Sequence, residues 1–123
     1  MIAADTSAWI DFAKGIASSG ARKLELCLFN DNLVMPLPVL HELLSGPGMT
    51  KDVEACVKAI PRLELDAEFW ERAAKTRRKL LSKGLKARAM DCLIAQSCID
   101  HGTPLIANDG DFRHFIKSGL KLV

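Results

Sequence analysis

Residues 2–5 are IAAD and residues 105–109 are LIAND, two short apolar runs that each end in an aspartate. An apolar run of this length, bounded by polar or turn-forming residues, is typical of a strand buried on both faces of a sheet. A third run occupies residues 33–35, and residues 63–65 and 120–123 are candidates for two further short strands. Longer segments of a different pattern separate all of them.

Those longer segments have apolar residues at helical spacing, and most of them end at glycine or proline. Thr6 or Ser7 is a candidate N-cap for the first helix, and Asp66 for the longest one. Short strands that alternate with helices predict an α/β fold, in which helices cover both faces of a parallel sheet. We expect helices at residues 8–14, 21–29, 38–45, 50–60, 67–82, 90–101 and 111–117.

The composition predicts one globular domain over residues 1–123. About half of the residues are hydrophobic (49%), and a chain of this length can bury a core without disulfides. No apolar run is long enough to span a membrane. The first residues place an acid where a signal peptide needs a basic start. We therefore expect a soluble protein in the cytoplasm.

Positive charge is concentrated in one part of the chain. Residues 72–88 hold eight basic residues and no acidic one, although the whole chain has a net charge of only +2. Such a block indicates contact with a polyanion on one face, or else a solvated helix face whose acidic partners lie elsewhere. The candidates for phosphate contact in this block are Lys75, Arg78, Lys79, Lys86 and Arg88.

Four acidic residues are candidates for one common site. Asp5 and Asp109 directly follow predicted strands, so both should lie at the carboxyl edge of the parallel sheet, where such folds bind ligands. Asp91 begins an apolar helix, and Glu42 lies among leucines, where an unpaired charge is costly. Each acid also has an ordinary alternative, such as a helix cap, a turn or a pair with lysine.

Converging carboxylates repel one another, and a hard divalent cation such as Mg²⁺ or Mn²⁺ would offset that repulsion. A site of this kind suits phosphodiester hydrolysis, with one metal ion or two. The sequence lacks the G-x-x-x-x-G-K-[ST], G-x-G-x-x-G and G-x-S-x-G motifs of competing mechanisms. Its histidines and cysteines lack zinc-site spacing.

Four motifs together resemble those of the PIN-domain family, and more narrowly the VapC-type toxins. They are IAADTS at residues 2–7, EL at 42–43, DCLIA at 91–95 and LIANDGDF at 105–112, and they cover nearly the whole chain in order. The resemblance implies a three-layer α/β/α fold with a central parallel sheet, Mg²⁺ or Mn²⁺ as cofactor, and endonucleolytic cleavage of RNA. It implies catalytic and metal-binding roles for Asp5, Glu42, Asp91 and Asp109, with Ser7, Asn108 and Asp111 as auxiliary residues.

The resemblance also implies partners: a homodimer, an RNA substrate such as a structured tRNA or rRNA loop, and a small VapB-like antitoxin that covers the site. One position departs from the family pattern, because Ala107 stands where a threonine or serine is usual. The alternatives are a PIN nuclease of RNA processing, a non-catalytic PIN-like binding module and, ranked lowest, a phospho-accepting receiver domain. The receiver would need paired acids after the first strand, where this chain has only Asp5.

Overall fold

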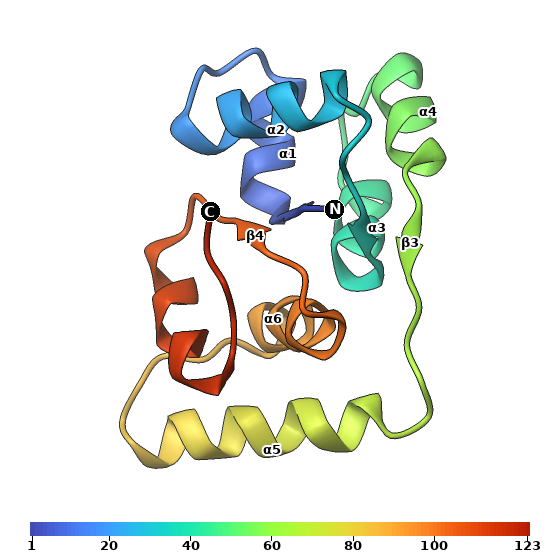
Figure 1. Cartoon of the computed structure of the whole chain (residues 1–123). Coiled ribbons are helices and arrows are strands. Elements are labelled where there is room, and N and C mark those ends of the chain that lie inside the picture. Colours follow the sequence, from blue (N-terminus) through green and yellow to red (C-terminus); the bar gives the residue numbers. More distant parts are fainter.

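The computed structural model describes all 123 residues and consists mainly of helices around a few very short strands (Figure 1). In chain order the strands are β1 (Ala3–Ala4), β2 (Met35–Pro36), β3 (Arg62–Leu63) and β4 (Leu105–Ile106). The helices are α1 (Thr6–Ala13), α2 (Ser19–Phe29), α3 (Leu37–Ser45), α4 (Lys51–Ala59), α5 (Phe69–Ser82), α6 (Ala89–His101) and the 3-10 helix η1 (Gly110–Ser118).

All strand pairings are parallel, as predicted. β1 pairs with β4 and β2 pairs with β3, and a single bridge from Ile2 to Leu33 joins the two halves. A bridge from Leu105 to Leu122 adds the C-terminal segment beyond β4. The order across the sheet is therefore β3, β2, β1, β4 and the C-terminal segment, with β1 in the middle. The predicted strands at 63–65 and 120–123 are reduced to Arg62–Leu63 and one bridged residue.

Helices lie on both sides of these strands, so the predicted three-layer α/β/α arrangement is confirmed. α1 and α2 lie above the strands in Figure 1, while α6, with α5 beyond it, lies below them. One cluster of 23 buried hydrophobic residues fills the space between the layers. Its largest fully buried side chains include Trp9, Leu24, Ile94, Leu105 and Phe115. None of the helices is long and apolar enough to cross a membrane.

Two predicted helix starts were wrong. The cap of α1 is Asp5 rather than Thr6 or Ser7, because the Asp5 carboxylate accepts a hydrogen bond from the Ala8 N–H and Thr6 already begins the helix. Asp66 does not cap α5, which begins at Phe69. The carboxylate of Asp66 instead pairs with Arg72 at 2.8 Å. The last predicted helix is present but has 3-10 geometry.

α6 ends at Gly102, which has a φ of 61° and donates its N–H to carbonyl groups of the last turn. No atom lies within 4 Å of the place that a Cβ would take, so only the left-handed backbone opposes a side chain there. We expect Gly102→Ala to lower the free energy of unfolding by about 1 kcal/mol. Gly102→Asn should cost less, because asparagine tolerates this conformation. Urea denaturation of the two variants tests this, and an alanine variant as stable as the wild type would contradict it.

Candidate functional site

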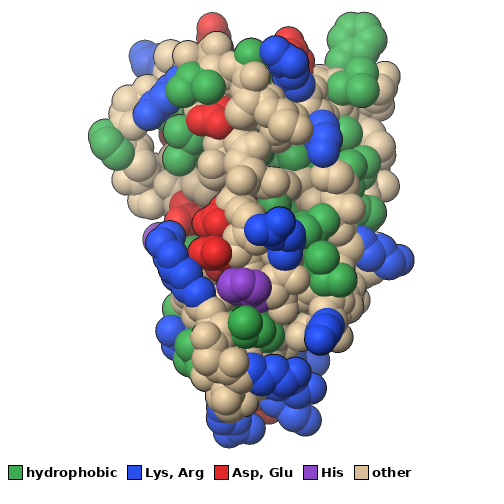
Figure 2. Space-filling model, turned by 90° about the vertical axis from the view of Figure 1, so that its left-hand side faces the viewer, with side chains coloured by type: hydrophobic (Ala, Val, Ile, Leu, Met, Phe, Trp, Pro, Cys, Tyr) green, Lys and Arg blue, Asp and Glu red, His purple; other side chains and the backbone are tan.

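The four predicted acids lie in one place. Asp5, Glu42, Asp91 and Asp109 all line a single pocket of about 280 Å³ at the carboxyl ends of β1 and β4. They come from four different parts of the fold: the end of β1, the middle of α3, the first turn of α6 and the turn after β4. Figure 2 shows acidic side chains gathered at mid-height on one face of the molecule, with basic side chains around them.

Asp5 is the most enclosed of the four, with an exposed fraction of 1%. Its Oδ1 accepts a hydrogen bond from the Ala8 N–H at 2.8 Å, and its Oδ2 accepts from the Asn108 N–H at 3.1 Å. Burial raises the pKa of the Asp5 carboxyl and repulsion by Asp109 adds to the rise, whereas the backbone N–H donors oppose it. The same carboxylate therefore caps α1 and fixes the position of the chain after β4.

Asp91 is half-buried in the first turn of α6. Burial raises the pKa of its carboxyl most, and repulsion from Asp109, Glu42 and Asp111 raises it further, against the attraction of Arg88. This mutual repulsion is the electrostatic consequence of gathering acids from distant parts of the chain. A bound cation would reduce this repulsion among the carboxylates.

Glu42 has the partner that its apolar surroundings require, but the partner is not a lysine. Its Oε1 accepts a hydrogen bond from the Thr6 hydroxyl at 2.5 Å, and no ion pair involves Glu42. Asp109 caps η1, because its Oδ1 accepts the Asp111 N–H at 2.9 Å. Both acids are thus oriented by neighbours at the start of the helices that meet here.

The pocket offers oxygen donors, yet no three His, Cys, Asp or Glu side chains come together closely enough to hold one ion between them. Mg²⁺ does not need three protein ligands, because it keeps several waters and binds through one or two carboxylates. The donor set therefore fits a hydrated, hard divalent cation. That these carboxylates bind a metal stays a prediction.

The auxiliary residues are divided between the pocket and its surroundings. Ser7 lines the pocket, whereas Asp111 lies outside it and its Oδ2 is 3.4 Å from the Lys86 Nζ. Ala107, at the position that departs from the family pattern, is half-buried and does not line the pocket. The hydroxyl groups of the pocket come instead from Ser7 and Thr6.

Asn108 does not line the pocket, but its side chain supports a residue that does. Its side-chain Nδ2 donates hydrogen bonds to Asp11 Oδ2 and to Ser18 Oγ, each at 3.0 Å, and its Oδ1 accepts from the Gly20 N–H at 2.9 Å. These bonds tie the segment between α1 and α2 to the end of β4. Asn108 therefore holds α1, and with it Asp11, which also lines the pocket.

Asp11 and Thr6 are pocket residues that the sequence analysis did not identify. For Asp11 a signal existed, because a residue four positions after Ser7 lies on the same face of a helix. For Thr6 the only signal was its position next to Asp5. The hydrogen bond from Thr6 to Glu42 joins residues 36 positions apart and has no sequence pattern.

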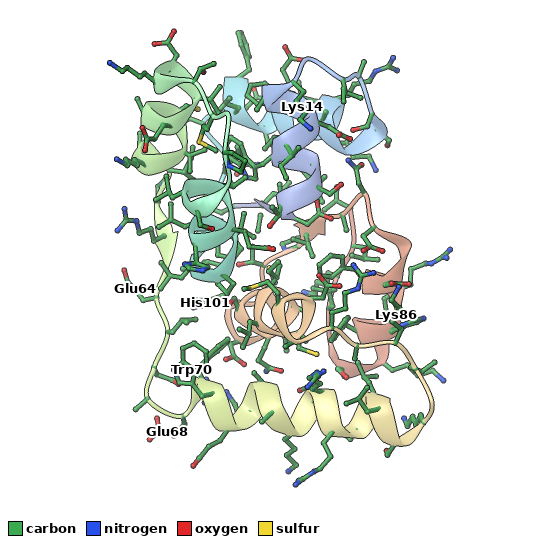
Figure 3. The ribbon with its side chains drawn as sticks, turned by 180° about the vertical axis from the view of Figure 1, so that it is seen from behind. Lys14, Glu64, Glu68, Trp70, Lys86 and His101 are labelled. Carbon is green, nitrogen blue, oxygen red and sulfur yellow. The ribbon has the colours of Figure 1, made fainter.

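The basic block does not act as one surface. Arg72 pairs with Asp66 and Asp100, and the Arg77 Nε donates to the Ala87 carbonyl, so both serve the fold. Of the five candidates for phosphate contact, Lys86 pairs with Asp111 outside the pocket, Arg88 lies near Asp91, and Lys75, Arg78 and Lys79 lie on α5. Lys86 lies beside η1 at one end of α5, and Trp70 lies at the other end (Figure 3).

Known proteins resemble this chain in sequence and in fold. The profile of the PIN domain matches residues 2–117. VapC ribonuclease Mb1587 of Mycobacterium bovis and ribonuclease VapC11 of Mycobacterium tuberculosis are each 32% identical to this chain over 119 residues, covering 91% of the chain and 89% of the relative.

Two solved structures share the fold. One is VapBC2 from Rickettsia felis bound to a DNA fragment from its promoter, with a TM-score of 0.75, 23% identity and coverage of 100% of this chain and 98% of that one. The other is VapBC-5 from Mycobacterium tuberculosis, with a TM-score of 0.67, 22% identity and coverage of 99% and 96%.

The network around Asn108 generates a stability prediction at Gly20. A Cβ on Gly20 would lie 2.7 Å from the Asn108 Cγ, so Gly20→Ala should displace the Asn108 side chain and break its hydrogen bonds. We expect a loss of about 1–3 kcal/mol in the free energy of unfolding, although alanine favours the helix by about 1 kcal/mol. Ser19→Ala, at an exposed neighbour in the same turn, is the matched control and should change little.

A double-mutant cycle separates displacement of Asn108 from a general effect on α2. In an Asn108→Ala background the obstacle is gone, so Gly20→Ala should become neutral or stabilising there. Equal destabilisation of Gly20→Ala in both backgrounds, measured by chemical denaturation, would contradict the proposed role of Asn108.

Proposed function

The chain belongs to the PIN-domain family and is of the VapC type, and from this premise we propose that it is an endoribonuclease that hydrolyses RNA phosphodiester bonds with Mg²⁺ or Mn²⁺. We further propose that it is the toxin of a VapBC-type toxin–antitoxin pair. The observation that carries the enzymatic proposal is the pocket in which Asp5, Glu42, Asp91 and Asp109 meet. The names of the relatives, which are VapC ribonucleases, support the choice of RNA as substrate.

Asp5, Glu42, Asp91 and Asp109 would supply oxygen ligands, the type that Mg²⁺ and Mn²⁺ prefer, with one or two of the carboxylates bound directly and the others reached through the waters of the ion. When bound, it would supply the positive charge that activates a water and stabilises charge on the phosphate. Its charge would also remove the repulsion that raises the pKa of Asp5 and Asp91 in the protein alone.

The protein contributes to the reaction by fixing the orientation of the acidic side chains in the pocket. Backbone N–H donors keep the Asp5 carboxylate in one orientation, and the Thr6 hydroxyl orients Glu42. Arg88 precedes α6, three residues before Asp91, and its charge lowers the pKa of that carboxyl. We propose that its guanidinium contacts the phosphate of the RNA beside the pocket. In this proposal the chain supplies oriented side chains and the positive charge of Arg88 beside the reacting phosphate, and preorganised groups of this kind lower a reaction barrier.

Partners follow from the same proposal. We propose a small VapB-like antitoxin that covers the acidic pocket, and a homodimer as the assembled toxin. The structural relatives described above are VapBC complexes, which supports an antitoxin partner. A toxin of this class would act on RNA in the cytoplasm, for example on a structured tRNA or rRNA loop.

Replacement of one acid tests the enzymatic proposal. Asp91→Asn keeps the shape of the side chain but removes a charge that would hold the metal, so cleavage of labelled tRNA should fall by about 100-fold or more. Asp52→Asn, on the exposed surface of α4, is the matched control and should cleave like the wild type. EDTA should stop wild-type cleavage and added Mg²⁺ or Mn²⁺ should restore it. Cleavage that survives both EDTA and Asp91→Asn would refute the proposal.

Growth experiments separate a toxin from a nuclease of RNA processing. Expression of the wild type should arrest growth, and co-expression of the neighbouring antitoxin gene should restore it. Asp91→Asn, present at the same level, should not arrest growth. A wild type that cleaves RNA in the test tube but leaves growth unchanged would be assigned to RNA processing instead.

A further inference from the structure

A second pocket, of about 300 Å³, lies between the C-terminal half of α5 and η1 and is lined mainly by basic side chains. We call it the basic pocket, and its lining consists of Lys79, Lys83, Arg113, His114 and Lys117 together with Leu80, Leu85 and Ser118. No acidic residue lines it. Three of its five basic residues lie outside the basic block of residues 72–88, so the sequence analysis did not detect it.

The positive charge of the basic pocket is not compensated within the protein. The ion pairs of the chain involve Lys58, Arg72 and Lys86, so no carboxylate oxygen lies within 4.0 Å of the charged nitrogens in this pocket. Interaction with helix dipoles accounts for Lys83 and Lys117, which lie at the C-terminal ends of α5 and η1. It does not account for Arg113 in the first half of η1, whose Nε donates to the Gly110 carbonyl at 3.2 Å but whose positive charge has no carboxylate partner. The cluster therefore indicates an external anion.

The floor of the basic pocket narrows the class of anion. Leu80 is buried and Leu85 is half-buried beneath the charged rim. An apolar floor contributes nothing to binding a small inorganic anion, which is hydrated on all sides. It suits a nucleotide, whose sugar or base can cover the leucines while its phosphate meets the lysines and the arginine.

The basic pocket adjoins the acidic pocket through η1. Asp109 and Phe112 line the acidic pocket, and the next residue, Arg113, lines the basic one. At the rise of a 3-10 helix, Asp109 and Arg113 are about 8 Å apart along the axis. Lys86 lines neither pocket but lies beside η1, where its Nζ is 3.4 Å from Asp111 and its carbonyl is 2.9 Å from the Nδ1 of His114, which lines the basic pocket. Basic side chains lie next to and below the acidic ones on this face (Figure 2).

We propose that the basic pocket binds the sugar–phosphate backbone of the RNA substrate, a short distance along the strand from the bond that is cleaved. This inference rests on the proposed function for the identity of the strand. An acidic protein segment would also meet the charge of the rim, so binding of the antitoxin by this pocket is one of the outcomes that the test distinguishes. Lys79, a candidate for phosphate contact from the sequence, would act here and not at the cleaved bond.

RNA binding in the absence of divalent metal tests the proposal without depending on cleavage. The probe is a fluorescein-labelled RNA of mixed sequence, about 20 nucleotides long, titrated with the full-length protein in EDTA at several KCl concentrations. Lys83→Gln/Lys117→Gln removes two charges from the basic pocket. Lys51→Gln/Lys58→Gln removes two charges from α4, at the other end of the molecule, and is the matched control (Figure 1).

We expect the basic-pocket variant to bind about 25-fold more weakly at 0.1 M KCl, with a salt slope that is smaller by about 1.4, the value for two lost contacts to a single strand. The control variant should keep the wild-type slope. All substituted lysines are exposed, so the melting temperatures of the variants should match the wild type. An unchanged slope in the basic-pocket variant, or an equal loss in the control, would overturn the proposal.

Two further outcomes keep this inference separate from the proposed function. If the basic-pocket variant binds RNA normally but loses its antitoxin, the pocket is a protein site and the proposal is overturned. If the wild type binds RNA through the basic pocket but never cleaves it, the proposed nuclease fails while the basic pocket stands.

Discussion

The rest of the structure depends on the placement of the Asp5 carboxylate at the carboxyl end of the central strand. It is nearly inaccessible to solvent, and it accepts hydrogen bonds from the start of α1 and from the chain after β4. A buried charge is tolerated only with such partners. One side chain thereby sets the start of α1 and holds the chain after β4 against the end of β1. The same bonds that stabilise the fold leave Asp5 in a fixed position for chemistry.

Crowding of like charges is the cost of this arrangement. Repulsion from other acids raises the pKa of Asp5 and Asp91 in addition to the effect of burial. The protein offsets the repulsion only in part, through Arg88 near Asp91 and Lys86 beside Asp111. The remaining excess of negative charge favours binding of a divalent cation. The repulsion that raises the pKa of these acids is therefore also the reason that the pocket suits the proposed metal.

The sequence was informative wherever a residue's role follows from its local surroundings. Asp5 and Asp109 were predicted because an acid that follows a buried parallel strand must reach the same edge of the sheet. Contacts between distant segments had no such signal: Asn108 bonds to Asp11 across 97 positions. Arg72 belongs to the basic block of residues 72–88, but in the structure its charge is paired with Asp66 and Asp100. Charge patterns give the composition of a surface, but only the fold decides which charges are already paired.

The 3-10 helix η1 explains how acidic and basic surfaces can adjoin without cancelling. Its first turn carries Asp111 and the acidic cap Asp109, and its later residues carry Arg113 and Lys117. The acidic residues at the N-terminal end and Lys117 in the last turn have the arrangement that the helix dipole favours, whereas Arg113 lies in the first half of the helix. With a rise of about 2 Å per residue, the 3-10 helix places Asp109 and Arg113 about 8 Å apart along its axis. One short element therefore contributes both to the acidic pocket proposed to hold a metal and to the basic pocket proposed to bind RNA.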